Sequence, residues 1–243
     1  MSYRGEELLI SAIAGLLAGT GHVAVGAASP VPAAAALLAR SRSEGDMRVS
    51  LLGSRQHSFF TDGGRELFDC AAQGRIDAFF LSGAQIDGQA NVNLVGIGDY
   101  PQSKVRLAGS FGSAYLYFLV PRVILFKPEH STRTLVPRVD FVSAPGVSPA
   151  GVYRPGGPTA LVTGRCVFTF DRDAARFRLA TVHPGQTVKE IRDNTGFEFD
   201  APEHVPTTPK PDAETFALIR GEICQEIAGT YPVFAADVFG HAA

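Results

Sequence analysis

The chain has 243 residues, enough for one large domain or two small ones around a buried core. Hydrophobic residues make up 45% of it and charged residues 19%, which excludes a disordered or coiled-coil chain. Because 22 Lys and Arg residues are balanced by 24 Asp and Glu residues, the charge argues against nucleic acid or a membrane surface as a partner.

The first predicted element is a helix over the apolar run 8–18. Glu6 and Glu7 precede this run, which is the wrong charge for an export signal. The run is also shorter than the roughly 20 apolar residues that cross a bilayer. Leu9 and Ile13 recur at helical spacing, so we expect an amphipathic core helix in a cytoplasmic protein.

Short apolar strands then alternate with helices over the first two-thirds of the chain. Parallel strands need long crossovers, so this order predicts an α/β fold with an open, mostly parallel sheet and helices on both faces. Such sheets bind ligands outside the carboxyl ends of their strands. The predicted strands are 22–25, 48–52, 77–81, 105–107, 122–126 and 140–143, and the predicted helices between them are 30–39 and 66–73.

The last third of the chain has a different pattern. Apolar and polar residues alternate in 160–163, 166–170 and 176–182, which predicts antiparallel strands. Thr187 and Glu190 have the spacing of a capping box at the start of a short helix. We expect Gly196 to end that helix in a left-handed conformation. A final helix is predicted over 212–227, and no linker interrupts the chain, so one domain is expected over residues 1–243.

Cysteine and histidine give no sign of a metal site. Cys70, Cys166 and Cys224 are an odd number without C-x-x-C spacing, so we expect reduced, buried thiols rather than a disulfide framework, a zinc site or a nucleophile. The six histidines show no H-x-x-x-H pair, and no metal is predicted.

The richest polar segment is 83–93 (GAQIDGQANVN), directly after a predicted strand. Gln85, Asp87, Asn91 and Asn93 place amide and carboxyl groups where an open sheet has its active site. The alternative is a tight turn in which Asp and Asn bond to their own backbone.

A glycine loop follows the predicted strand 105–107. It consists of Gly109, Ser110, Phe111, Gly112 and Ser113. Glycines at such a place let backbone N–H groups approach a carbonyl oxygen, a phosphate or a developing oxyanion. The segment lacks the G-x-G-x-x-G pattern, so an ordinary turn is the alternative.

Several blocks in the same order resemble the β subunits of family I CoA-transferases, of the glutaconate CoA-transferase type. The polar segment resembles a loop of that family, except that Ala90 stands where the family has Gly. The other blocks are 130–146 (HSTRTLVPRVDFVSAPG), 166–199 (CVFTFDRDAARFRLATVHPGQTVKEIRDNTGFEF) and 206–223 (PTTPKPDAETFALIRGEI).

The resemblance implies a fold of the CoA-transferase type, which is similar to that of NagB and RpiA. It also implies a homologous α subunit as partner and an acyl-CoA substrate at the interface. Coenzyme A would enter as part of the substrate, with no other cofactor. The glycine loop would lie near the thioester carbonyl, and the polar segment 83–93 would contact the substrate.

One departure from the family concerns the nucleophile. Family β subunits carry a Glu in a Ser-Glu-Asn/Ser-Gly motif, which attacks the thioester and becomes a glutamyl-CoA thioester. Here Ser54 stands at that place, and no carboxylate follows until Asp62. A serine hydroxyl needs a positioned base. His57 is the candidate in sequence, although two loop side chains at this spacing usually point apart.

The chain is therefore not expected to transfer CoA with a nucleophile of its own. The steroid-ring-cleaving hydrolase branch of the family has the same loss, and there a carboxylate of the partner subunit is the expected base. An acyl-CoA hydrolase subunit of that kind and a non-catalytic CoA-binding partner are the alternatives to a transferase subunit.

Overall fold

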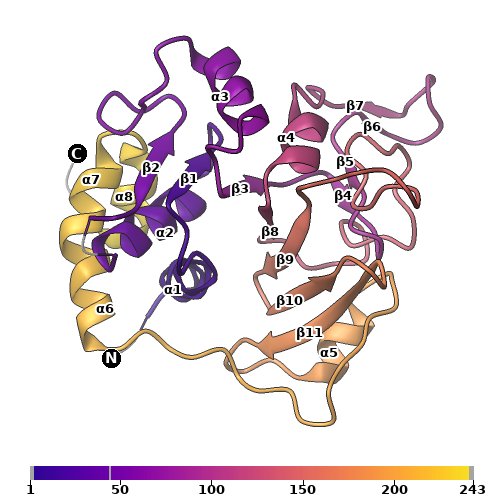
Figure 1. Cartoon of the computed structure of the whole chain (residues 1–243). Coiled ribbons are helices and arrows are strands. Elements are labelled where there is room, and N and C mark those ends of the chain that lie inside the picture. The colour runs from indigo at the N-terminus through magenta and orange to yellow at the C-terminus, as the bar shows by residue number, and fades with distance from the viewer. Residues whose placement is uncertain (1–2, 44, 241–243) are drawn as a thin grey trace. The chain divides into compact units, whose positions relative to one another are not determined.

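The structure is a computed structural model that describes residues 3–43 and 45–240 (Figure 1). The chain divides into two compact units. The first consists of Met1–Phe80 and Pro209–Ala243, and the second of Leu81–Thr208. The single domain expected over residues 1–243 stays a prediction.

The first unit is built around short parallel strands. Strand β1 pairs in parallel with β2 on one side and β3 on the other. Because crossovers between parallel strands are right-handed, the reversal of direction after β2 places α2 and α3 on opposite faces. Its elements are α1 (Gly5–Leu16), β1 (His22–Val25), α2 (Pro30–Ser41), β2 (Arg48–Leu51), α3 (Gly63–Ala72), β3 (Ala78–Leu81), α6 (Ala213–Leu218), the π-helical turn η1 (Ile219–Ile223), α7 (Cys224–Ala228) and α8 (Pro232–Phe239).

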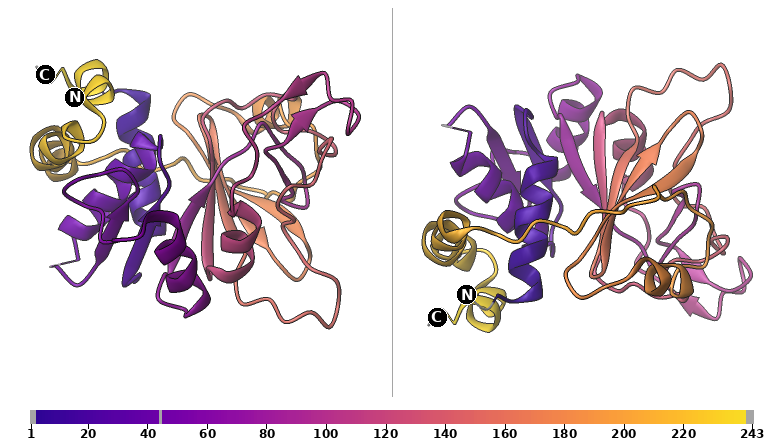
Figure 2. Two further views of the ribbon diagram at one scale, coloured as in Figure 1. Left: turned by 90° about the horizontal axis from the view of Figure 1, so that it is seen from above. Right: turned by 90° about the horizontal axis from the view of Figure 1, so that it is seen from below.

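The C-terminal helices of the first unit pack against its N-terminal part, and α7 contacts α2. Both views in Figure 2 show these helices, in yellow, beside the indigo N-terminal segment. The start predicted for the last helix is confirmed, since the Asp212 carboxylate accepts a hydrogen bond from the backbone N–H of Thr215 at 2.8 Å. Helix α8 was not predicted.

The second unit combines a parallel pair of strands with an antiparallel meander. Strand β8 pairs in parallel with β9, and the pairs β9–β10 and β10–β11 are antiparallel, as predicted for the last third of the chain. Its elements are β4 (Gln85–Ile86), β5 (Val92–Asn93), β6 (Gly96–Ile97), β7 (Val105–Arg106), α4 (Ser113–Leu119), β8 (Arg122–Lys127), β9 (Pro158–Thr163), β10 (Cys166–Asp171), β11 (Arg176–Val182) and α5 (Val188–Asp193).

The strand predicted over 140–143 is wrong. This segment runs beside the β4–β5 hairpin without forming a strand of its own, and its contacts mix side-chain and backbone groups. The hydroxyl of Ser143 donates to the carbonyl of Val92 at 2.8 Å and accepts from the N–H of Leu94 at 3.0 Å. Pro137 and Pro145 flank the segment and remove two N–H donors that a strand would use.

The capping box at the start of α5 is confirmed, because the side chains of Thr187 and Glu190 each accept a hydrogen bond from the other's backbone N–H, at 3.2 and 2.8 Å. The left-handed conformation expected for Gly196 is wrong, since its φ is not positive. Glycine is needed there for another reason. A Cβ at Gly196 would lie 2.4 Å from the carbonyl oxygen of Leu135, to which the N–H of Gly196 donates at 2.7 Å.

Candidate functional site

The polar segment 83–93 forms the β4–β5 hairpin, and its side chains hold that hairpin together. Asp87 is buried, and its Oδ1 accepts hydrogen bonds from the N–H groups of Gln89 and Asn91 at 3.0 and 3.1 Å. Oδ1 of Asn91 in turn accepts from the N–H of Gly146 at 3.1 Å. This is the tight-turn geometry of the second alternative. A role of these side chains in substrate binding stays a prediction.

Gln85 and Asn93 face each other across the hairpin, and both are buried. Nδ2 of Asn93 donates to Oε1 of Gln85 at 2.8 Å and to the carbonyl of Gly96 at 2.7 Å. Oε1 of Gln85 also accepts from the N–H of Asp140 at 2.9 Å. Because Oε1 is the acceptor in both bonds, the Nε2 group of Gln85 remains as a donor.

Ala90, which stands where the resembling family has glycine, has a backbone conformation that favours glycine. It is fully buried and has a φ of 59°, in the left-handed region that costs an L-residue energy. Its carbonyl accepts a hydrogen bond from the buried hydroxyl of Tyr117 at 2.9 Å, which ties α4 to the hairpin. Burial raises the pKa of Tyr117 well above its usual value, so this hydroxyl stays a donor.

Replacing Ala90 by Gly is expected to raise the free energy of unfolding by about 0.5 kcal/mol. The relief of left-handed strain exceeds the added entropy of glycine in the unfolded chain and the loss of one buried methyl group. Urea unfolding of Ala90→Gly measures the effect. Ala235→Gly, in the interior of α8, is the control and should lose about 1 kcal/mol. An equal loss in both variants would show that position 90 carries no strain.

The glycine loop is anchored to the chain that follows β5. The N–H of Gly109, whose φ is +101°, donates to the carbonyl of Leu94 at 3.1 Å. The N–H of Ser113 donates back to the carbonyl of Ser110 at 2.8 Å, where α4 begins. The structure thus brings the loop and the polar hairpin together within the second unit.

The middle of this loop presents backbone donors. Phe111 has a φ of 40° and is 78% exposed, so the loop projects outward at this residue. Within the described part of the chain, the N–H groups of Ser110 and Gly112 have no acceptor. Free backbone N–H groups close together in a loop are what an oxyanion site requires.

Ser54 lies in the first unit, directly after β2, and is only 6% exposed. Its hydroxyl oxygen accepts hydrogen bonds from the N–H of His57 at 3.1 Å and from the hydroxyl of Thr230 at 2.9 Å. Thr230 lies between α7 and α8, so the C-terminal segment covers this position. No local pattern signals this contact, since the two residues are 176 positions apart in the sequence.

His57 is not arranged as a base for Ser54. Nε2 of its buried imidazole lies 3.1 Å from the Glu226 carboxylate, and Nδ1 lies 3.4 Å from the Arg40 guanidinium. Arg40 also pairs with Glu226 at 2.5 Å. Burial lowers the pKa of His57. The Glu226 carboxylate opposes this shift, and the Arg40 guanidinium adds to it. The imidazole is therefore directed to an ion pair.

The carboxylates that follow Ser54 are engaged locally. Asp62 pairs with Arg65 at 3.0 Å on the exposed first turn of α3. Glu66 accepts hydrogen bonds from the N–H of Asp62 at 3.2 Å and from the hydroxyl of Thr61 at 2.9 Å. Backbone and side-chain hydrogen bonds from these residues lower the pKa of Glu66.

The cysteines are free and buried, as predicted. Burial raises the pKa of Cys166 to about 12, which leaves its thiol protonated and unreactive. Among the described residues, no group of three His, Cys, Asp or Glu side chains has the arrangement of a metal site. Within the same residues, no helix has the length and apolar character needed to span a bilayer.

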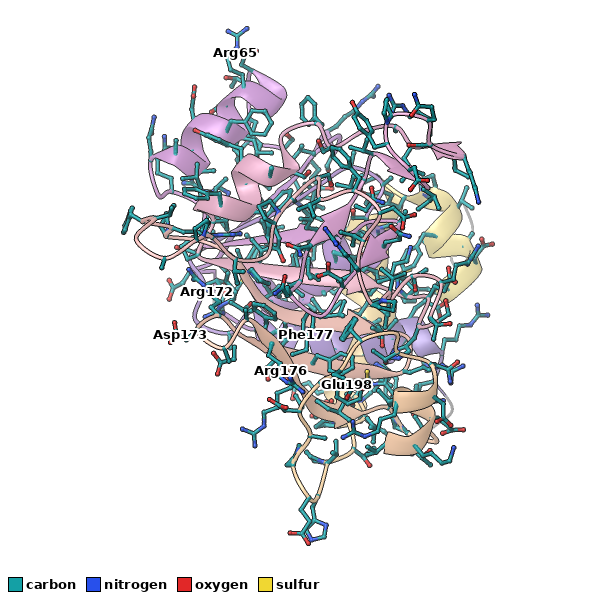
Figure 3. The ribbon with its side chains drawn as sticks, turned by 90° about the vertical axis from the view of Figure 1, so that its right-hand side faces the viewer. Arg65, Arg172, Asp173, Arg176, Phe177 and Glu198 are labelled. Carbon is teal, nitrogen blue, oxygen red and sulfur yellow. The ribbon has the colours of Figure 1, made fainter. Side chains whose placement is uncertain are left out.

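Two cavities border the polar hairpin within the second unit. The first has a volume of about 810 Å³, and Figure 3 shows two of its charged lining residues, Arg176 and Glu198, on one face of this unit. The second has a volume of about 500 Å³ and includes Lys127, the last residue of β8. Sequence reasoning missed Lys127. Its signal is a lysine that directly follows the apolar middle of β8, residues 123–126.

Comparison with known proteins shows which proteins this chain resembles in sequence and in fold. The B-type subunit of glutaconate CoA-transferase from Acidaminococcus fermentans is 34% identical over 151 residues, 59% of this chain and 56% of that protein's length. The cholesterol ring-cleaving hydrolase IpdB subunit of Rhodococcus jostii is 27% identical over 232 residues, 88% of this chain and 90% of that protein. The crystal structure of the decarboxylase AibA/AibB superposes with a TM-score of 0.79 at 25% identity, over 99% of this chain and 100% of the matched one. The family model described as Coenzyme A transferase matches residues 7–194. This chain therefore belongs to the coenzyme A transferase family.

Proposed function

We propose that this chain is the β-type subunit of a heteromeric enzyme that acts on an acyl-CoA thioester. A homologous α subunit is the partner, and this chain supplies no glutamate nucleophile. The carrying observation is Ser54, a buried hydroxyl bonded to Thr230 at the place of the family's glutamate. The names of the relatives support a two-subunit enzyme, since they include a B-type subunit of a CoA-transferase and an AibA/AibB pair.

Ser54 cannot replace the missing carboxylate chemically. A serine hydroxyl is protonated at neutral pH and attacks a thioester only when a base removes its proton. The imidazole of His57, the candidate base in the sequence, is directed to Glu226 instead. The anhydride and the glutamyl-CoA thioester of ordinary CoA transfer therefore have no source at this position. The base for the reaction is then a side chain of the α subunit.

Hydrolytic cleavage of a C–C bond in a cyclic acyl-CoA, with the thioester left intact, is the second candidate reaction. It is favoured by the match to the ring-cleaving hydrolase subunit, which extends over 88% of this chain. Water deprotonated by the base of the α subunit would attack a ring ketone and form a tetrahedral alkoxide. Collapse of this alkoxide breaks the bond between the former ketone carbon and the α-carbon of the thioester. The products are a carboxylic acid and a thioester enolate, which then takes up a proton. The N–H groups of Ser110 and Gly112 are free to hold the developing negative charge.

Replacing Ser54 by Ala tests this assignment. We expect kcat of the reconstituted α/β complex to change less than twofold, because the hydroxyl takes no part in the chemistry. The free energy of unfolding should fall by about 1 kcal/mol, since Thr230 loses its acceptor. The measurements are consumption of the acyl-CoA, followed by chromatography, and urea unfolding. Thr230→Val is the matched control and should show the same pair of effects. A hundredfold loss of kcat in Ser54→Ala alone would make Ser54 catalytic.

A further inference from the structure

The cavity of about 500 Å³ in the second unit lies at the carboxyl end of a parallel strand. Strand β8 ends at Lys127, which is paired in parallel with Thr163 of β9. Ligands of open α/β sheets bind outside such strand ends. The cavity is lined by Ala84, Gln85, Ile97, Val105, Lys127, Glu129, Arg133 and Thr134.

Lys127 brings a positive charge without a direct partner to this cavity. Within the described part of the chain, its ammonium group has no ion pair or hydrogen bond. Glu129 does not neutralise it directly, because its carboxylate is held by Arg133 through bonds of 2.9 to 3.1 Å and by the Ser131 hydroxyl at 2.8 Å. Lys127 is half-buried, and burial lowers its pKa while Glu129 opposes the shift. A bound anion would remove this cost.

Gln85 supplies a second, neutral donor. Its side chain is only 6% exposed and lines the same cavity. Both hydrogen bonds to its Oε1 come from the hairpin and from Asp140, which fixes the orientation of the amide. Within the described residues its Nε2 group donates to no acceptor. An ammonium group and an amide N–H₂ together suit the oxygens of one carboxylate.

The remaining walls indicate what the carboxylate is attached to. Ala84, Ile97 and Val105 give the cavity an apolar side. A hydrocarbon chain fits such a wall, whereas a phosphate requires more donors around its oxygens. We propose that this cavity binds a carboxylate carried on a short hydrocarbon chain, with Lys127 as its counter-ion and Gln85 as its hydrogen-bond donor. The identification of this carboxylate as the free end of a dicarboxylic acyl group rests on the proposed function.

Competitive acetylation of the full chain measures binding without turnover. The lysines are Lys104, Lys127, Lys189 and Lys210, so mass spectrometry resolves each one. Glutarate should slow acetylation of Lys127 at least fivefold and leave the other three unchanged. Equal protection by the neutral diamide glutaramide, or by inorganic phosphate, would overturn the assignment of a carboxylate site.

Variants add an independent readout. In calorimetric titrations, Lys127→Gln should weaken glutarate binding at least tenfold, and Lys127→Arg should retain most of it. The matched control is Lys189→Gln, because Lys189 is an exposed lysine paired with Asp193. This variant should bind glutarate as tightly as the wild type does. Equal binding by Lys127→Gln and wild type would contradict the proposal. Circular dichroism spectra check that each variant is folded.

The two proposals fail separately. If the α/β complex turns over no acyl-CoA while glutarate still protects Lys127, the proposed function is wrong and the carboxylate site stands. If acyl-CoA is turned over and glutarate leaves Lys127 unprotected, the carboxylate site is wrong and the proposed function stands.

Discussion

Acidification from pH 6.5 to pH 4 is expected to lower the free energy of unfolding by about 3 kcal/mol through His130 alone. This histidine is 6% exposed. Its two ring nitrogens lie 2.8 and 2.9 Å from the hydroxyls of Thr163 and Thr195. Burial lowers the pKa of His130 from 6.5 to about 4, and the nearby Arg165 adds to the shift.

The sign follows from proton uptake. The folded pKa lies below the unfolded value, so the unfolded chain binds more protons between about pH 6.5 and pH 4. The contribution of neutral His130 to the free energy of unfolding is therefore fully present above this pH range and is lost as the pH falls through it. Burial also lowers the pKa of His22, His57 and His183, so these histidines too lower the free energy of unfolding at acid pH.

Urea unfolding at several pH values measures the effect. His130→Gln keeps hydrogen-bonding groups near both threonines but takes up no proton, so its stability should depend less steeply on pH than that of the wild type. His204→Gln makes the same substitution at an exposed histidine and serves as the control. Equal slopes for His130→Gln and wild type would show that His130 titrates normally in the folded chain.

Gly146→Ala is expected to lower the free energy of unfolding by at least about 3 kcal/mol. A Cβ at this position would lie 2.1 Å from the carbonyl oxygen of Gln89 and 2.8 Å from the carbonyl carbon of Ala90. Both atoms belong to the backbone, so no side-chain rotation relieves the overlap. The β4–β5 hairpin would have to separate from the segment at Gly146, which also breaks the bond to Asn91.

Gly15→Ala is the matched control, because a Cβ there meets no atom within 4 Å and the residue lies in the last turn of α1. The free energy of unfolding of the Gly15→Ala variant should rise by about 1 kcal/mol. Thermal and urea unfolding compare the two variants. A loss of less than about 1 kcal/mol in Gly146→Ala would mean that the hairpin can move away from position 146 at little cost. The close approach of Gly146 to the hairpin backbone would then not require glycine.

Prediction from sequence succeeds where burial alone decides the pattern. Strands β1 and β3 are apolar throughout or nearly so and buried at every position, so their existence follows from composition. The strand at 140–143 fails because its partners are side-chain atoms of Gln85 and backbone groups of the hairpin, which no local pattern reveals. Gly196 fails for a similar reason, since its contact with Leu135 is distant in sequence.

The candidate site, too, could be predicted from the sequence only in part. The residue types at Ser54 and at Ala90 are visible in the sequence as departures from a resembling family. The structure adds why each matters: the left-handed φ of Ala90, and the hydrogen bond from Thr230 to Ser54. Lys127 escaped notice because an unpaired charge is recognised only once its surroundings are known.

Thioester chemistry in the proposed enzyme should not pass through a carboxylate of this chain. Intact-protein mass spectrometry of the reconstituted α/β complex, incubated with an acyl-CoA and quenched in acid, measures this directly. The mass of this chain should stay unchanged while the acyl-CoA is consumed. A mass increase on this chain equal to bound coenzyme A, mapped to Glu66, Glu226 or any other carboxylate, would contradict the proposed chemistry.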